Sequence, residues 1–213
     1  PVALDTGIGT SYEDPRYTGW FRGVRAHNVV AVDEAEPEKV AERLAFGENR
    51  VRMRSRAYEH AYGIVHEREI RVLPGRGWLI LDRLTARTSL AGRRIDWLLH
   101  TPYALAPLAP GVLHAAAGDG GLLVLAGRPE TLEAPVITTT PATVPVPAAV
   151  ALRIVDTVRH YADEIIRDVT MLTWRHRPVA GDTAEFVTAL VPYRGERPDV
   201  RLVDTSAGWT LQT

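Results

Sequence analysis

A strict alternation of side chains with period two is the feature that most constrains what this chain can fold into. Between Asn49 and Glu59, arginines alternate with apolar or small residues. An extended strand points successive side chains to opposite faces, so this segment predicts a strand with one guanidinium-rich face. The alternating residues are Arg50, Val51, Arg52, Met53, Arg54, Ser55, Arg56 and Ala57.

Further segments share the alternation or are short apolar runs bounded by turn residues. The predicted strands run 28–33, 63–73, 78–85, 95–103, 111–117, 122–127, 149–155, 165–175, 185–192, 200–205 and 209–212. Many short strands separated by close turns predict an all-β fold, an antiparallel two-sheet β-sandwich of the super-sandwich type with minimal helix. We expect residues 1–213 to form one domain.

Three connecting segments carry local signals of their own. Gly118-Asp119-Gly120-Gly121 predicts a hairpin turn, because glycine tolerates positive φ. Residues 37–46 predict the one helix, with Val40 and Leu44 four residues apart. Residues 134–149 hold four prolines, which indicates an extended surface crossing.

Composition excludes several classes of site and partner. The chain has no cysteine, so disulfides and thiolate metal sites are excluded. The net charge of −1 gives no overall field that would favour nucleic acid. No apolar run reaches the roughly 18 residues of a membrane span. The chain opens at Pro1 without methionine, as expected for a fragment of a longer protein.

The arginine row at positions 50–56 has two readings that the sequence leaves open. Guanidinium forks match sulfate and carboxylate, so the row could hold a polyanionic glycan. Alternatively, it is the solvated outer face of a sheet.

Histidines, a tyrosine and a carboxylate gather in the N-terminal part of the chain. The positions of Tyr62 and His66 differ by an even number, so the two side chains would share one face of a strand. His60 would continue that face if the strand starts early enough. A neighbouring strand from His27 to Asp33 could add an imidazole and a carboxylate. Such a set could form a zinc site, and the phenol could act as a base. Hydrogen-bonded structural histidines are the competing interpretation.

A combination of motifs carries a family resemblance. The run Phe-Arg-x-x-x-Ala-His-Asn-x-Val-x-Val-Asp spans Phe21 to Asp33, and Asp5-Thr6-Gly7 and Tyr12 precede it. His-x-Tyr-Gly, His-x-Arg and a tryptophan-containing strand that ends in Asp82 follow. Together, over Leu4 to Leu84, this combination resembles the heparinase II/III-like family of polysaccharide lyases.

The resemblance implies a β-sandwich that follows an N-terminal α/α toroid, with the cleft between them. The implied reaction is β-elimination at a uronic acid: a base takes the C5 proton, the carboxylate is neutralised, and an acid protonates the leaving oxygen. Some members hold zinc with two histidines and an aspartate. The resemblance further implies an acidic polysaccharide as partner, and it alone favours a periplasmic or secreted location.

Carrying the motifs over gives specific candidates. His27 is implied to be a zinc ligand or the cleft histidine, and Tyr62 the catalytic tyrosine of the sandwich. The implied metal set is His27, Asp33 and His66. Implied substrate contacts are Arg22, Arg25, Asn28 and His60. Arg25 stands where some relatives have a second histidine, and an arginine there could neutralise a uronate carboxylate.

The sequence therefore predicts the β-sandwich part of a uronate-polysaccharide lyase, with no activity of its own. We expect His27 and His66 to share a metal or a hydrogen-bond network. The alternative is a non-catalytic glycan-binding or scaffolding sandwich, because a fold does not fix a function.

Overall fold

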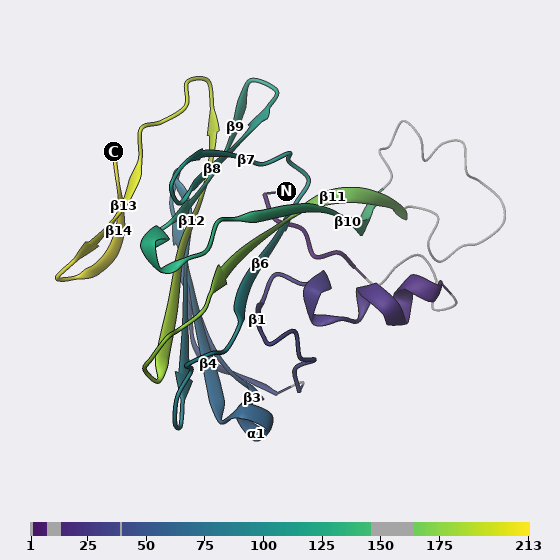
Figure 1. Cartoon of the computed structure of the whole chain (residues 1–213). Helices are drawn as coiled ribbons and strands as arrows, with labels where there is room; N and C mark the ends of the chain where they lie inside the picture. Colours follow the sequence, from purple (N-terminus) through teal and green to yellow (C-terminus); the bar gives the residue numbers. More distant parts are fainter. Residues whose placement is uncertain (1, 8–13, 39, 146–163) are drawn as a thin grey trace.

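Two antiparallel sheets pack face to face in the computed structural model, which describes residues 2–7, 14–38, 40–145 and 164–213 (Figure 1). Alternating side chains from both sheets fill the space between them. The predicted all-β two-sheet sandwich is confirmed. No helix in these described ranges is long and apolar enough to cross a membrane.

The larger sheet has eight strands, all joined to their neighbours in antiparallel fashion. Its order is β2 (Ala41–Gly47), β3 (Arg50–Tyr58), β4 (Ile64–Leu73), β5 (Gly77–Ala86), β12 (Thr183–Arg194), β9 (Gly120–Ala126), β8 (Val112–Ala117) and β7 (Ala106–Ala109). The predicted glycine-rich hairpin is the β8–β9 connection.

The smaller sheet has four strands, in the order β1 (Val30–Val32), β6 (Ile95–Thr101), β11 (Glu164–His176) and β10 (Val136–Pro145). A separate hairpin pairs β13 (Arg201–Thr205) with β14 (Gly208–Gln212). The helical segments of the described residues are the single turns η1 (Tyr17–Phe21), η2 (Val24–Ala26), α1 (Glu59–Tyr62) and η3 (Pro129–Thr131).

Strand β6 shows how the two faces of the smaller sheet differ. Ile95, Trp97 and Leu99 point into the main core between the sheets, where Trp97 packs on Trp174 of β11 at a ring-centroid distance of 5.4 Å. Asp96, Leu98 and His100 alternate with them and therefore point to the outer face of the smaller sheet. Leu98 is buried there, in a second cluster with Val24 of η2. The N-terminal turns thus cover part of this outer face (Figure 1).

The helix predicted for residues 37–46 is wrong. Residues 41–47 form β2, which pairs with β3 at the edge of the larger sheet. Val40 and Leu44, the apolar pair that suggested a helical face, are 49% and 37% exposed. Hydrogen bonding to β3 therefore overrides a weak local helix signal.

Residues 134–149 were predicted as an extended surface crossing, but residues 136–145 form a paired strand, β10. β10 lies at the edge of the smaller sheet, where a missing proline N–H is tolerated because one side of the strand needs no partner. β7 was not predicted. The strand predicted for residues 149–155 lies outside the described residues.

Candidate functional site

The N-terminal segment, residues 2–7, runs beside the end of β6. The Leu4 backbone N–H donates to the His100 carbonyl at 2.9 Å, and the Thr143 N–H donates to the Thr6 carbonyl at 2.8 Å. The buried Thr6 hydroxyl donates to the Ala26 carbonyl at 2.7 Å. These bonds fix the segment against β6, β10 and η2, directly next to the Ala-His-Asn motif.

His27 and Asp5 form the centre of this region. Nδ1 of His27 lies 2.9 Å from Oδ2 of Asp5, and Oδ1 of Asp5 accepts the Gly7 N–H at 2.9 Å. The hydrogen bond from His27 holds the pKa of Asp5 below its usual value, assisted by the Gly7 N–H. Side-chain exposures of 35% for His27 and 60% for Asp5 leave the pair accessible from solvent. The chain thus offers an accessible imidazole oriented by a carboxylate.

Asn28 anchors this pair to the interior. Its side-chain N–H donates to the Leu4 carbonyl at 2.6 Å, and its Oδ1 accepts the His100 backbone N–H at 2.6 Å. Nδ1 of His100 lies 3.2 Å from the same oxygen. The His100 side chain is fully buried, and burial lowers its pKa to about 4. A neutral His100 that donates from Nδ1 therefore supports Asn28. The Asn28 side chain is engaged in these hydrogen bonds within the protein, and its role as a substrate contact stays a prediction.

A buried carboxylate, Asp82 of β5, forms a second network in the core. Oδ1 accepts from Nε2 of His66 and from Nε of Arg68, both at 2.6 Å, and Oδ2 accepts from the Trp97 indole at 2.9 Å. Burial alone would raise the pKa of Asp82, but Arg68 and His66 outweigh it and hold that pKa far below its usual range. The carboxylate is therefore charged and held by four donors, since Nη2 of Arg68 adds a bond at 3.1 Å.

Arg68 joins the two networks, because its Nη1 donates to the Asn28 carbonyl at 2.6 Å. The network around His66 thus reaches Asn28, the residue that follows His27 in the chain, and a network shared by His27 and His66 themselves stays a prediction. Their rings contact different carboxylates, Asp5 and Asp82 respectively.

Asp33, the third predicted metal ligand, lies elsewhere. It accepts from Arg93 at 2.7 Å and from the Arg94 backbone N–H at 2.9 Å. Across residues 2–7, 14–38, 40–145 and 164–213, no three His, Cys, Asp or Glu side chains gather as a metal site would require. The carboxylate that meets His27 is Asp5, which the Asp-x-Gly lead-in of the motif could have indicated.

Tyr62 and His60 lie on the single turn α1, before β4 begins at Ile64. The alternation predicted that His60 and Tyr62 share a strand face with His66. This prediction is wrong, because neither residue lies on β4. The Arg93 guanidinium stacks 4.5 Å from the Tyr62 ring centroid. His60 is 88% exposed and faces Glu38 at 3.5 Å. Tyr62 is thus linked through Arg93 to Asp33, after the end of β1, whereas His27 precedes β1.

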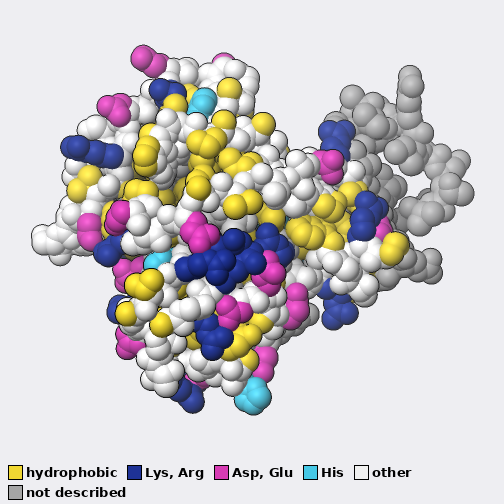
Figure 2. Space-filling model, in the orientation of Figure 1, with side chains coloured by type: hydrophobic (Ala, Val, Ile, Leu, Met, Phe, Trp, Pro, Cys, Tyr) yellow, Lys and Arg dark blue, Asp and Glu magenta, His cyan; other side chains and the backbone are white. Residues whose placement is uncertain are grey.

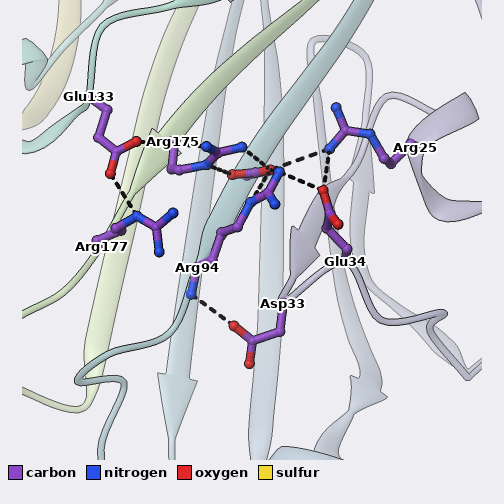
Figure 3. Close-up of polar contacts among 8 residues, drawn as sticks. Arg25, Asp33, Glu34, Arg94, Glu133, Arg175 and Arg177 are labelled. Atoms are coloured by element: carbon purple, nitrogen blue, oxygen red, sulfur yellow. Dashed lines mark hydrogen bonds and ion pairs between the residues drawn. The ribbon is translucent and has the colours of Figure 1, made fainter.

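The remaining predicted substrate contacts are arginines. Arg22 is exposed and its Cζ lies 5.7 Å from the Tyr17 ring centroid. Arg25 extends over the outer face of the smaller sheet to Glu34 and Asp96 (Figure 3).

The arginine row of β3 is confirmed as one outer sheet face, and each of its members has a carboxylate partner. Arg52 and Arg54 both pair with Glu67 of β4, the latter at 2.7 Å. Arg50 pairs with Glu69, and Arg56 with Glu59 at 3.1 Å. This ion-pair ladder favours the solvated-face interpretation over a dedicated glycan site.

A family model described as heparinase II/III-like, C-terminal, matches residues 1–130, which is more than half of the chain. The chain belongs to the heparinase II/III-like family. The matched range of this heparinase II/III-like chain contains Asp5, His27 and the whole Asp82 network. A search of curated proteins finds no match.

Solved heparinase structures have the same fold as this heparinase II/III-like chain. One form of heparinase III with methylated lysines superimposes with a TM-score of 0.71 at 12% identity, over 97% of this chain and 30% of that one. A mutant heparan sulfate lyase from Pedobacter heparinus gives 0.67 at 14%, over 96% and 30%. Another heparinase III gives 0.66 at 16%, over 95% and 29%. The chain therefore spans about 30% of the length of these lyases, and the likeness shows the fold.

Proposed function

We propose that this chain is the β-sandwich part of a uronate-polysaccharide lyase and that it lends His27, oriented by Asp5, to a cleft completed by a preceding α/α toroid domain. The observation that carries the proposal is the accessible His27–Asp5 pair in a chain of the heparinase II/III-like family. The ligand class, an acidic polysaccharide, follows from the lyases that share the fold.

The geometry supports a proton-transfer role for His27. A carboxylate on Nδ1 keeps the proton of the neutral ring there, so that Nε2 presents a lone pair. Such a ring can take the C5 proton of a uronate or return a proton to the leaving oxygen. Elimination consumes no water, so a pair of carboxylates spaced for hydrolysis is not required. Tyr62 remains a second proposed proton-transfer residue. It is linked through Arg93 to Asp33, after the end of β1, whereas His27 lies before β1, so the two side chains would meet different parts of the sugar chain.

The same pair supports a zinc ion as an alternative role. Nδ1 of His27 and Oδ2 of Asp5 are hydrogen-bonded at 2.9 Å, whereas two ligands about 2.0–2.1 Å from a tetrahedral zinc lie about 3.3 Å apart, so the pair would have to give up this hydrogen bond and separate slightly to hold the ion. Bound there, zinc would act as a Lewis acid towards a substrate oxygen. A third protein ligand would have to come from outside the described residues. His66 and Asp82 fit zinc poorly, because the Arg68 guanidinium already occupies the carboxylate.

Absorbance of the unsaturated uronate product tests the proposal. The isolated 213-residue chain and the same chain joined to its toroid domain would be incubated with several uronate polysaccharides. We expect product only from the longer protein, since half a cleft cannot hold the sugar in register. Product from the isolated chain would show that the site is complete within it. Binding without product from the longer protein would favour a non-catalytic glycan-binding sandwich.

A further inference from the structure

A second cluster of charged side chains lies on the outer face of the smaller sheet, around Asp96 of β6. Asp96 is 1% exposed. Arg94 donates to its Oδ2 from Nε at 2.9 Å and from Nη2 at 2.7 Å. Arg175 of β11 donates to Oδ1 at 2.7 Å and to Oδ2 at 3.0 Å. Two arginines thus satisfy the buried carboxylate (Figure 3).

Arg25 is a third guanidinium that Asp96 does not need. Its Nη1 lies 3.5 Å from Oδ2 of Asp96, but only 3.2 Å from Oε1 of Glu34. Arg94 also reaches this Glu34 oxygen, at 2.6 Å. The Glu34 side chain is 47% exposed and Arg25 29% exposed. Glu34 therefore places a carboxylate between Arg25 and Arg94 on the solvent side of the cluster.

The backbone that carries Glu34 is held without its side chain. Asp33 and Glu34 have φ values of 53° and 58°, a conformation that costs non-glycine residues energy, and the Ala35 N–H closes the turn onto the Val32 carbonyl at 3.0 Å. Asp33 fixes the turn through the Arg94 N–H at 2.9 Å. The Glu34 side chain can consequently leave the arginines while the turn stays in place.

We propose that Arg25 and Arg94 form a binding site for an external carboxylate or sulfate group, and that Glu34 is its built-in competitor. Guanidinium forks match both anions in shape and charge. An exposed ion pair such as that of Glu34 is weak, so an external anion can replace it with little loss. Arg25 engages only Nη1 in the contacts of the described residues, which leaves its other N–H groups for an incoming anion.

The local charge favours such a replacement. Five arginines face four carboxylates, for a net charge of +1, which becomes +2 when Glu34 turns to solvent. The arginines are Arg25, Arg93, Arg94, Arg175 and Arg177, and the carboxylates are Asp33, Glu34, Asp96 and Glu133. Figure 2 shows a compact group of basic side chains at the centre of this face.

The site lies on β6, whose far end bonds to Leu4 and Asn28, the chain neighbours of Asp5 and His27. Asp96 and His100 are four residues apart on β6, so the cluster lies about 13 Å from the strand end that supports Asn28. A polyanionic chain lying along β6 could reach both places. The anion site follows from the arginine geometry alone, whereas a glycan as the source of the anion rests on the proposed function.

Titration of the full chain with inorganic sulfate at low ionic strength, followed by calorimetry, tests the site. Glu34→Gln keeps the side-chain size and removes the competing charge, so we expect about two- to fivefold tighter sulfate binding. Arg25→Gln should weaken binding about fivefold or more. Arg128→Gln is the matched control, because Arg128 is a half-exposed arginine paired with Asp204 at 3.3 Å elsewhere on the surface.

Unchanged or weaker sulfate binding by Glu34→Gln would overturn the proposal, as would equal effects of Arg25→Gln and Arg128→Gln. Glu34→Gly provides a second variant, since glycine also relieves the positive φ, and it should tighten binding as well. Parallel titrations with glucuronate distinguish a carboxylate source from a sulfate source. None of these measurements depends on elimination activity, so the anion site and the lyase function fail separately.

Discussion

Lowering the pH from 7.5 to 5.0 should destabilise the fold, and the buried imidazole of His100 should contribute a defined part of that loss. Its folded pKa of about 4 lies below the unfolded value of about 6.5, so the unfolded chain binds the proton more readily. The stability that neutral His100 contributes is therefore complete above pH 6.5 and is lost as the pH falls towards 4. These two values give a loss of about 2 kcal/mol at pH 5.0 and about 3 kcal/mol once both states are protonated.

Urea denaturation at both pH values, followed by tryptophan fluorescence, measures this loss. His100→Gln lowers stability at pH 7.5 but should reduce the pH-dependent difference by about 2 kcal/mol relative to the unmodified chain. His176→Gln is the matched control, because His176 lies at the surface and bonds the Thr131 carbonyl. A pH-dependent loss that is the same with and without His100 would refute the argument that this imidazole is buried in its neutral form.

Three further predictions concern packing and buried charge. Asp82→Asn should lower the unfolding free energy by about 3–5 kcal/mol, because it leaves the partly buried Arg68 guanidinium without its anion. Asp204→Asn, in an exposed ion pair, is the control and should change it by less than about 0.5 kcal/mol. An Asp82→Asn loss below about 1 kcal/mol in urea denaturation would contradict this prediction. Gly77→Ala should be far more destabilising than Gly75→Ala in thermal unfolding, since a Cβ at residue 77 would lie 2.0 Å from a backbone carbonyl oxygen while the one at 75 meets open space; equal shifts in Tm would count against the close approach. Phe46→Ser should change the unfolding free energy by less than about 0.5 kcal/mol in urea denaturation, because this side chain is 76% exposed. A larger loss would show that Phe46 is buried against another surface in solution.

Side-chain periodicity, together with short apolar runs, predicted the sandwich well: β8 alternates between buried and half-buried residues over its first four positions, whereas β6 is a mainly apolar strand that is buried on both faces. Periodicity failed for β2, where both faces are exposed and no buried stripe exists to read. Local composition then favoured a helix, and only the pairing with β3 decides the outcome. β10 was hidden for a similar reason, since its prolines are acceptable only at a sheet edge.

The candidate site was predictable in part. The Ala-His-Asn motif singled out His27 as a candidate, and the carboxylate that contacts its ring lies 22 residues upstream rather than on the following strand. Asp33 was a candidate because it ends the strand predicted to follow His27, yet the positive φ at that residue turns the chain away after β1. Alternation extrapolated from β4 put Tyr62 on a strand face, although Gly63 with φ of 67° ends a separate helical turn there.

Elimination kinetics of the toroid-linked protein with two variants test the central claim most directly. His27→Gln and Asp5→Asn would be compared with His176→Gln on a uronate polysaccharide, at matched folding judged by circular dichroism. We predict that unsaturated product forms normally with His176→Gln and falls by about 10²-fold or more with His27→Gln. Product formation should fall less with Asp5→Asn, because Asp5 orients the imidazole but does not itself transfer the proton. Unimpaired product formation by His27→Gln would contradict the claim that this sandwich lends His27 to the cleft.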